Sequence, residues 1–387
     1  MNTRNRLCRR MIWASLVTIF AVSVATQMNA QPSQPTRPFG DVEVLATVPA
    51  STGFPEGIAV RGNKVYVAGP ARFGTAGDGT PSRVFVYDAN SGALVRTYDI
   101  QGEDLNQDHA NSCIAFDDVG LLYIVNFQLG IVRLDLGSGH QEVYAAPLPN
   151  LQPCSAVAPP CSPTVFDAPP LGNDIAFDED GNLYETDSFQ ATIWRIPPGG
   201  GQPQIWFQDS RLDTPFGPNG LRLSPDRTKI YFAVTADAVG QFGQFLGGKI
   251  YTLPLVANPT AAQLQVFHEY NGEAPDGIAF AKSGLLYVAL AAPFNSGVSI
   301  LNPDGTEAAR LHNDQDPTFP YDSPANIAFN KDGSIVITNH AFATMTPAHF
   351  VVLDVFVDDK ESPLVKTLTE SGPGAMEDPR PSAPPDP

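Results

Sequence analysis

Short apolar runs, several of them alternating with polar positions, follow one another along most of the chain, separated by turns rich in glycine, asparagine and aspartate. The stretch PNGLRLSPDRTKIYFAV, residues 218–234, holds a turn, an apolar run, a second turn and another apolar run. Similar stretches begin at Pro55 (PEGIAVRGNKVYVAG), Gly172 (GNDIAFDEDGNLYETD) and Pro275 (PDGIAFAKSGLLYVAL). Apolar runs of this length between turn residues are typical of β-strands, so the pattern predicts a repeated β unit.

Each unit has an apolar triplet near its start, so the number of triplets gives the number of repeats. The six copies are Ile58-Ala59-Val60, Ile114-Ala115-Phe116, Ile175-Ala176-Phe177, Leu221-Arg222-Leu223, Ile278-Ala279-Phe280 and Ile327-Ala328-Phe329. Successive triplets begin 46 to 61 residues apart, which is in or slightly above the range of propeller blades and leaves no room for a helix in each unit. Most units contain two further strands after the hairpin. The chain is therefore predicted to be all-β, a six-bladed β-propeller with four-stranded blades.

The ends of the chain differ from the repeats. Residues 41–49, DVEVLATVP, form a lone strand, which would complete the last blade and remove an exposed sheet edge. Four arginines precede an apolar run from Met11 to Ala25, as in a secretory signal, and this run is too short to span a membrane comfortably. We therefore predict a signal peptide at 1–30, a linker at 31–40, the propeller at 41–360 and a disordered proline-rich tail at 361–387.

Composition and cysteine usage agree with an exported globular protein. A hydrophobic content of 43% supports a sizeable core, and a net charge of −18 makes nucleic acid an unfavourable partner. The mature chain is expected to be secreted or periplasmic, without a membrane span. In an oxidising compartment, Cys154 and Cys161 are predicted to form a disulfide, because a thiolate metal site needs closely spaced ligand pairs that are absent from this sequence. Cys113 is predicted to be a small buried side chain within a strand.

Loop lengths distinguish the two faces of the predicted propeller. The turns between the first and second strands of each unit are short, whereas the loops on the other face hold the large insertions at 70–81, 147–172 and 236–247. Because insertions on one face of a repeat protein commonly mark its binding face, we expect the functional site there.

One position in the repeat varies in a chemically specific way. The residue two places before each triplet is Glu56, Ser112, Asn173, Asn219, Asp276 or Ala325. Innermost strands line the axis of a propeller, so these side chains are expected to converge on the insertion face. Two carboxylates and two amide oxygens suit Ca²⁺ or another divalent cation, whereas zinc would prefer histidine or thiolate. The alternative is that PEG, PNG and PDG serve only as turn sequences.

The order PEG, ND, PNG, PDG along six repeats resembles the senescence marker protein (regucalcin)/gluconolactonase family, from about residue 41 to 357. The resemblance implies one catalytic Ca²⁺, or another divalent cation, held by Glu56, Asn219 and Asp276, with Asn173 binding directly or through water. The second repeat departs from the family in reading NSCIAF, and the arginine that binds sugar in the second blade of gluconolactonases has no clear counterpart. The metal site is therefore better supported than a sugar substrate.

These observations predict a calcium-dependent hydrolase that acts on a small-molecule lactone or ester, with Asp276 accepting the proton of the attacking water. The alternative is a non-catalytic propeller in which calcium joins the blades and a ligand or protein partner binds. Asn126, Asp187 and His340 end second strands on the same face and are candidate substrate contacts. Asp187 is equally suited to capping its turn, and His340 either donates a proton or is structural. No feature of the sequence specifies an oligomeric state.

Overall fold

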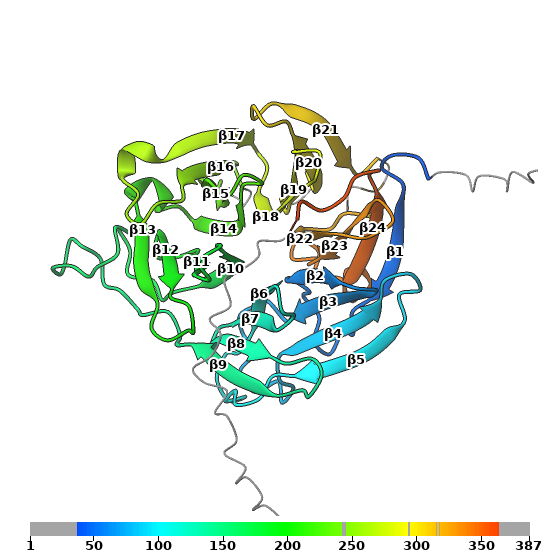
Figure 1. Ribbon diagram of the computed structural model, residues 1–387, viewed down its shortest axis with the longest axis horizontal. Helices are drawn as coiled ribbons and strands as arrows, with labels where there is room; N and C mark the ends of the chain where they lie inside the picture. Colours follow the sequence, from blue (N-terminus) through cyan, green and yellow to red (C-terminus); the bar gives the residue numbers. More distant parts are fainter. Residues whose placement is uncertain (1–36, 242–244, 293–294, 315, 317, 364–387) are drawn as a thin grey trace, which may run out of the picture. The chain divides into compact units, whose positions relative to one another are not determined.

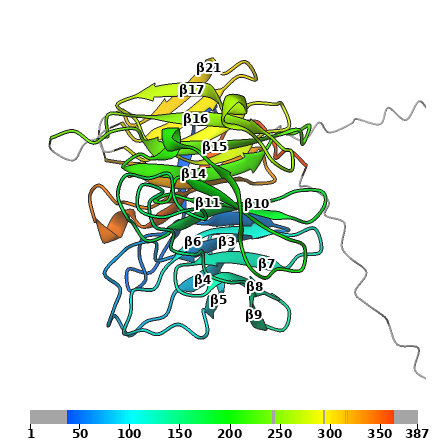
Figure 2. The ribbon, with the colours of Figure 1, turned by 90° about the vertical axis from the view of Figure 1, so that its left-hand side faces the viewer.

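The structure, a computed structural model, describes residues 37–363 apart from 242–244, 293–294, 315 and 317. It contains six separate four-stranded antiparallel sheets arranged in a ring, which confirms the predicted six-bladed β-propeller (Figure 1). Figure 2 shows the ring from the side. The predicted signal peptide and nearly all of the predicted tail lie outside the described residues.

The first three blades follow one another directly along the chain. Blade 1 contains β2 (Ile58–Arg61), β3 (Lys64–Gly69), β4 (Arg83–Asp88) and β5 (Leu94–Asp99). Blade 2 contains β6 (Asn111–Phe116), β7 (Leu122–Asn126), β8 (Gly130–Leu134) and β9 (Gln141–Ala145). Blade 3 contains β10 (Gly172–Phe177), β11 (Leu183–Asp187), β12 (Thr192–Ile196) and β13 (Gln204–Gln208). In each blade the first strand is the innermost.

The last three blades complete the ring. Blade 4 contains β14 (Phe216–Leu223), β15 (Lys229–Ala236), β16 (Gly247–Pro254) and β17 (Gln265–Asn271). Blade 5 contains β18 (Pro275–Phe280), β19 (Leu286–Leu290), β20 (Gly297–Leu301) and β21 (Glu307–His312). Blade 6 contains β22 (Pro324–Phe329), β23 (Ser334–Asn339) and β24 (Val351–Phe356). Helix within the described residues is limited to the 3₁₀ turns Ser210–Leu212, Ala261–Gln263 and Pro347–His349, and none of it is long and apolar enough to cross a membrane.

The fourth strand of blade 6 comes from the start of the propeller sequence. Strand β1 (Val42–Thr47), blue in Figure 1, pairs antiparallel with β24, from Val42 opposite Val355 to Thr47 opposite Val351. This confirms the predicted lone strand. Because β1 covers the outer edge of β24, the two ends of the propeller are joined by main-chain hydrogen bonds and that edge of β24 is not left open.

Hydrophobic packing lies between neighbouring blades. Each of the six hydrophobic clusters draws its residues from two adjacent sheets, such as Trp206 of blade 3 with Phe232 of blade 4. Successive side chains of a strand point to opposite faces, and here both faces of a blade are covered by its neighbours. This explains why β3, β7 and β19 are apolar along almost their whole length.

The innermost strands approach one another closely around the axis. A Cβ atom at Gly57 would lie 2.5 Å from the carbonyl oxygen of Ser112, and one at Gly220 would lie 2.3 Å from that of Asp276. Neither glycine is in a turn, and neither has a positive φ angle. The glycine of PEG and PNG is therefore required by contact between blades.

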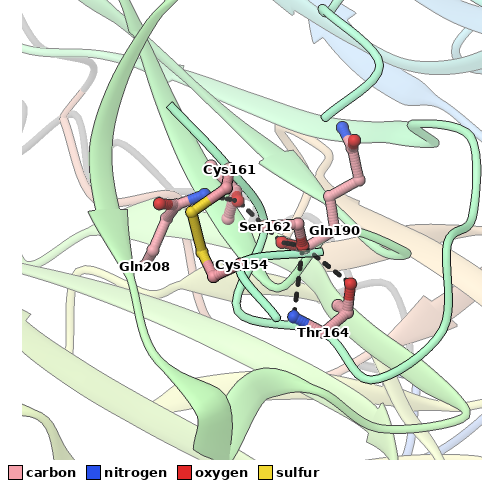
Figure 3. The surroundings of a disulfide bond; sticks show 7 residues. Cys154, Cys161, Ser162, Thr164, Gln190 and Gln208 are labelled. Atoms are coloured by element: carbon pink, nitrogen blue, oxygen red, sulfur yellow. Dashed lines mark hydrogen bonds between the residues drawn. A yellow bond between two sulfur atoms is a disulfide. The ribbon is translucent and has the colours of Figure 1, made fainter. Parts of the chain in front are cut away.

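The predicted disulfide is present between Cys154 and Cys161, in the insertion before blade 3 (Figure 3). The next residue, Ser162, donates its hydroxyl to the carbonyl oxygen of Gln190 at 2.9 Å, and the Gln190 side chain accepts from the amide of Leu151 at 2.6 Å. The disulfide thus closes a small loop, and the chain on either side of this loop is hydrogen-bonded to the β11–β12 turn. Cys113, as predicted, is a buried free cysteine.

The chain continues past blade 6 along the inner end of blade 5. Ser362 donates its amide to the carbonyl oxygen of Phe280 at 3.0 Å, and Glu361 forms a bridge with Ala281. These contacts extend slightly beyond residue 360, where the propeller was expected to end. Glu361 and Arg222 both line a small cavity at the end of the innermost strands opposite the large insertions.

Candidate metal centre and its cavity

A cavity of about 460 Å³ opens on the face that carries the insertions. The residues two places before five of the six triplets line it: Glu56, Ser112, Asn173, Asn219 and Asp276. The insertions contribute Ala71, Arg72 and Phe73 from the first, Leu171 from the second and Phe245 from the third. Five of the six repeat positions and parts of all three insertions therefore lie around one cavity.

Local irregularities of the innermost strands occur at these positions. The pairing of β10 with β11 shifts between Gly172 and Ile175, that of β14 with β15 between Pro218 and Leu221, and that of β18 with β19 between Pro275 and Ile278. Asn173, Asn219 and Asp276 lie within these bulges. A bulge bends its strand and redirects side chains, so these three candidate ligands lie at irregularities rather than in a regular ladder. Glu56 lies just before β2, outside the paired residues of its blade. Since PNG and PDG lie inside β14 and β18, they do not serve as hairpin turns.

Hydroxyl groups of preceding blades hold the main chain of the candidate ligands. Thr338 of blade 6 donates to the carbonyl oxygen of Glu56 at 2.6 Å. Thr186 of blade 3 donates to that of Asn219 at 2.7 Å, and Ser112 of blade 2 donates to that of Asn173 at 2.9 Å. Each of these buried bonds joins two neighbouring blades, so the ring itself sets the backbone position of the site.

The two candidate amide ligands are oriented by hydroxyl groups. Nδ2 of Asn219 donates to Oγ1 of Thr235 at 2.9 Å, and Nδ2 of Asn173 donates to Oγ of Ser188 at 3.3 Å. With the nitrogen of each amide used in this way, its Oδ1 is left as the atom that can act as a ligand. Supporting groups of this kind commonly tune metal affinity.

Two buried carboxylates lie on the floor of the cavity. Burial raises the pKa of Glu56 to about 8, with a further contribution from the charge of Asp174. Burial also raises the pKa of Asp276 well above its usual value, with Glu56 as the next cause, and Oδ1 of Asp276 is buried without a hydrogen-bond partner. Two buried acids whose charged forms are both disfavoured, one of them with an orphaned oxygen, are the arrangement that a bound cation would stabilise.

The sequence prediction missed an ion pair directly along the axis. Arg222 donates through Nη1 to Oδ2 of Asp174 at 2.7 Å; the Asp174 side chain is fully buried, and that of Arg222 is 24% exposed. The middle residue of the triplet is alanine in five repeats and arginine in the fourth, and that difference was visible in the sequence. The Arg222–Asp174 pair neutralises a third carboxylate beside Glu56 and Asp276. Within the described residues, no group of three or more His, Cys, Asp or Glu side chains forms a metal site, consistent with a candidate set of two acids and two amides.

His340 lines the cavity beside Glu56. Its Nε2 lies 2.8 Å from the carbonyl oxygen of Ala71 and 3.7 Å from Oε2 of Glu56, and burial lowers the pKa of the ring to about 4. A carbonyl oxygen can only accept, so Nε2 carries the hydrogen and Nδ1 of the neutral ring carries none. In this geometry Nδ1 of His340 can accept a proton or hydrogen bond but cannot donate one.

Asn126 and Asp187 do not line the cavity. Nδ2 of Asn126 donates to Glu103 and Asn111, and Oδ1 accepts from the amides of Gln128 and Leu129. Asp187 is fully buried; its Oδ1 accepts three main-chain amides and its Oδ2 accepts from the side chains of Gln190 and Trp194. Of the two roles considered for Asp187, this geometry supports the turn cap, and both side chains are held in hydrogen bonds outside the cavity lining.

Comparison with known proteins supports the fold. No family model and no curated protein matches the sequence. The calcium-binding protein regucalcin from Agrobacterium tumefaciens has a TM-score of 0.56 and 17% identity, over 84% of this chain and 97% of that one. A gluconolactonase from Xanthomonas campestris has a TM-score of 0.53 and 17% identity, over 82% and 89%. The chain has the fold of these proteins. A luciferin-regenerating enzyme also matches, with a TM-score of 0.54, 13% identity and coverage of 85% and 99%, so the fold alone does not specify the reaction.

Proposed function

We propose that this protein is an exported, calcium-dependent hydrolase that opens lactones or closely related esters. The observation that carries the proposal is the convergence of Glu56, Asn173, Asn219 and Asp276, from four blades, on the floor of one cavity. The gluconolactonase and regucalcin that share this fold support the choice of reaction and of metal. Export rests on the N-terminal sequence.

The residues at the site fit calcium. Two carboxylates and two amide oxygens form a hard, all-oxygen donor set, and the orphaned Oδ1 of Asp276 lacks any other partner. Bound there, calcium would polarise the carbonyl of the substrate and offset the negative charge that develops on its oxygen. The Arg222–Asp174 pair is already satisfied, so it adds no further ligand charge.

Side chains of the chain itself would move the proton. Asp276 lies on the floor of the cavity and is proposed to take a proton, at its carboxylate oxygen, from the water that attacks the carbonyl carbon. The bond from that carbon to the ring or ester oxygen then breaks, and the departing oxygen takes the proton back from Asp276, which gives a carboxylic acid and an alcohol and restores the carboxylate. Nδ1 of His340 has no proton to give in the neutral ring, so His340 is suited to orienting the attacking water as an acceptor. No covalent intermediate with the protein is required.

A metal analysis combined with a pH-indicator assay tests the proposal. We expect about one calcium ion per purified mature chain, together with lactone hydrolysis that disappears on chelation and returns when calcium is restored. One bound calcium with no hydrolysis of any lactone or ester would favour the non-catalytic binding propeller instead. A calcium stoichiometry of zero in calcium-containing buffer would remove the basis of both.

A further inference from the structure

The walls of the cavity are formed largely by phenylalanine. Phe73 comes from the insertion of blade 1, Phe127 from the turn after β7, and Phe216 from the start of β14. The ring centroids of Phe73 and Phe127 lie 6.0 Å apart, and Phe189 stacks on Phe73 at 6.2 Å while meeting Phe216 edge-on at 5.6 Å. We call Phe73, Phe127 and Phe216, with Phe189 in contact, the aromatic wall. It spans contributions from four blades, so no single repeat reveals it.

Several apolar side chains of the cavity remain open to solvent. Phe73 is 58% exposed, Phe342 57% and Met345 59%. Phe342 and Met345 line the same cavity and follow β23, and Phe342 lies 6.0 Å from the ring of His340. Large apolar groups gathered at the mouth of a cavity are unfavourable in water and commonly mark a site for an apolar ligand.

Most polar groups of the walls already have a partner within the protein. Arg72 is the one cationic side chain among the described lining residues; it pairs with Asp78, donates to the carbonyl oxygens of Phe73 and Gly74, and lies over the ring of Phe54. The hydroxyls of Ser112 and Thr235 are hydrogen-bonded, and that of Ser323 accepts from the amide of Ala343. Thr52 has a buried hydroxyl without a partner, which provides one further contact at most.

A sugar would therefore be poorly matched to these walls. Each buried hydroxyl of a polyhydroxylated ligand that finds no partner lowers affinity, since it has given up its hydrogen bonds to water. An anionic ligand would meet no unpaired cation among the described lining residues, on a chain of net charge −18.

We propose that the substrate is an uncharged lactone or ester with a hydrocarbon body, which packs against the aromatic wall while its carbonyl faces the floor of the cavity. This inference rests on the proposed hydrolase function in so far as the ligand is called a substrate. The preference for an apolar ligand does not depend on turnover. The two can therefore be measured separately, by binding of inert analogues and by hydrolysis.

Binding is measured by calorimetry with lactams, the amide analogues of lactones, on the full mature protein in calcium. The probes are δ-valerolactam, its 6-pentyl derivative and gluconolactam. We expect the pentyl lactam to bind at least tenfold more tightly than δ-valerolactam, below the roughly thousandfold ceiling set by about fourfold per buried methylene. Gluconolactam should bind more weakly than either.

The variant Phe73→Ala tests the wall itself. Phe73 is largely exposed, so its loss should leave the fold intact, and we expect the pentyl lactam to bind about three- to tenfold more weakly, with δ-valerolactam little changed. Phe166→Ala is the matched control, because Phe166 is 81% exposed and does not line the cavity. It should change neither affinity.

Hydrolysis of the corresponding lactones separates the two ideas. If the three lactams bind in the expected order but no lactone is hydrolysed, the apolar ligand class is preserved and the hydrolase is rejected. The opposite outcome has two parts: calcium-dependent hydrolysis is faster with gluconolactone than with the pentyl lactone, and the pentyl group brings no gain in lactam affinity. This outcome would preserve the hydrolase and overturn the proposed substrate class. An unchanged affinity of Phe73→Ala for the pentyl lactam would overturn the role of the wall.

Discussion

At the scale of single residues, Asp276 combines two tasks that a substitution can separate. Asp276→Asn keeps an oxygen at the same position but removes the negative charge and the proton acceptor. Turnover at saturating calcium is expected to fall by about 10² or more, the range for loss of a general base, while calcium affinity falls moderately. Steady-state kinetics across a calcium titration measure both quantities.

Asp314→Asn is the matched control for this substitution, since the Asp314 side chain is 86% exposed. It should leave turnover unchanged. Ser112→Ala, although it occupies an equivalent repeat position, is a poor control because the Ser112 hydroxyl joins blade 2 to the main chain of Asn173. Full turnover of Asp276→Asn at saturating calcium would assign the proton to another acceptor.

At the scale of secondary-structure elements, β1 closes the ring through five residue pairs with β24. A chain that begins at Val48 lacks this strand and exposes the edge of β24. At about 1 kcal/mol of net stability for each lost hydrogen bond, we expect its free energy of unfolding to fall by roughly 3 to 5 kcal/mol and its tendency to associate to rise. Urea unfolding and size-exclusion chromatography, with a chain that begins at Pro38 as control, measure these effects. Equal stability of the two chains would contradict the closure role.

At the scale of the whole molecule, calcium should stabilise the ring, because its four candidate ligands come from four blades. Calcium at 100 times its dissociation constant adds about 2.7 kcal/mol to the free energy of unfolding if only the folded chain binds it. The pKa of Glu56 in the metal-free fold is about 8, above its usual value, so the folded chain binds the extra proton and metal-free stability falls as pH rises toward 8. Calcium replaces that proton.

The difference in melting temperature between calcium-loaded and chelated protein is therefore expected to widen from pH 5 to pH 8. Differential scanning calorimetry at a series of pH values measures it. Titrating groups away from the site cancel to first order in the difference, whereas Asp276, whose pKa is also raised, contributes in the same direction as Glu56. Glu56→Gln removes one of the two ionisable groups and should reduce the pH dependence. A difference that stays constant with pH would show that Glu56 is not linked to calcium binding.

The sequence by itself determined the fold and the ring of candidate ligands. Strand periodicity and the recurring triplet specify six blades because both reflect local backbone geometry and burial, which repeat identically in each unit. The residues two positions before each triplet occupy equivalent places around the axis, because the repeats are related by symmetry. The proximity of Glu56, Asn173, Asn219 and Asp276 could therefore be predicted without coordinates. The disulfide was predicted from the spacing of the two cysteines and from the export expected of the chain.

Only the tertiary structure decided what surrounds that ring. Thr186, Thr235 and Thr338 look like ordinary strand residues until the fold brings their hydroxyls against the candidate ligands. Thr186 and Thr338 reach them from a neighbouring blade, and Thr235 from the next strand of the same blade. The aromatic wall joins residues from four blades, and the hydrogen-bonding partners of Arg72 lie within its own loop. Neither set of contacts involves positions that recur from repeat to repeat, so the repeat pattern does not predict them. Asn126 and Asp187 occupied the expected strand ends but point into hydrogen-bond networks of their own blades. Periodicity places a residue along its strand, whereas side-chain partners depend on irregular loops and on packing across blades, which no local pattern encodes.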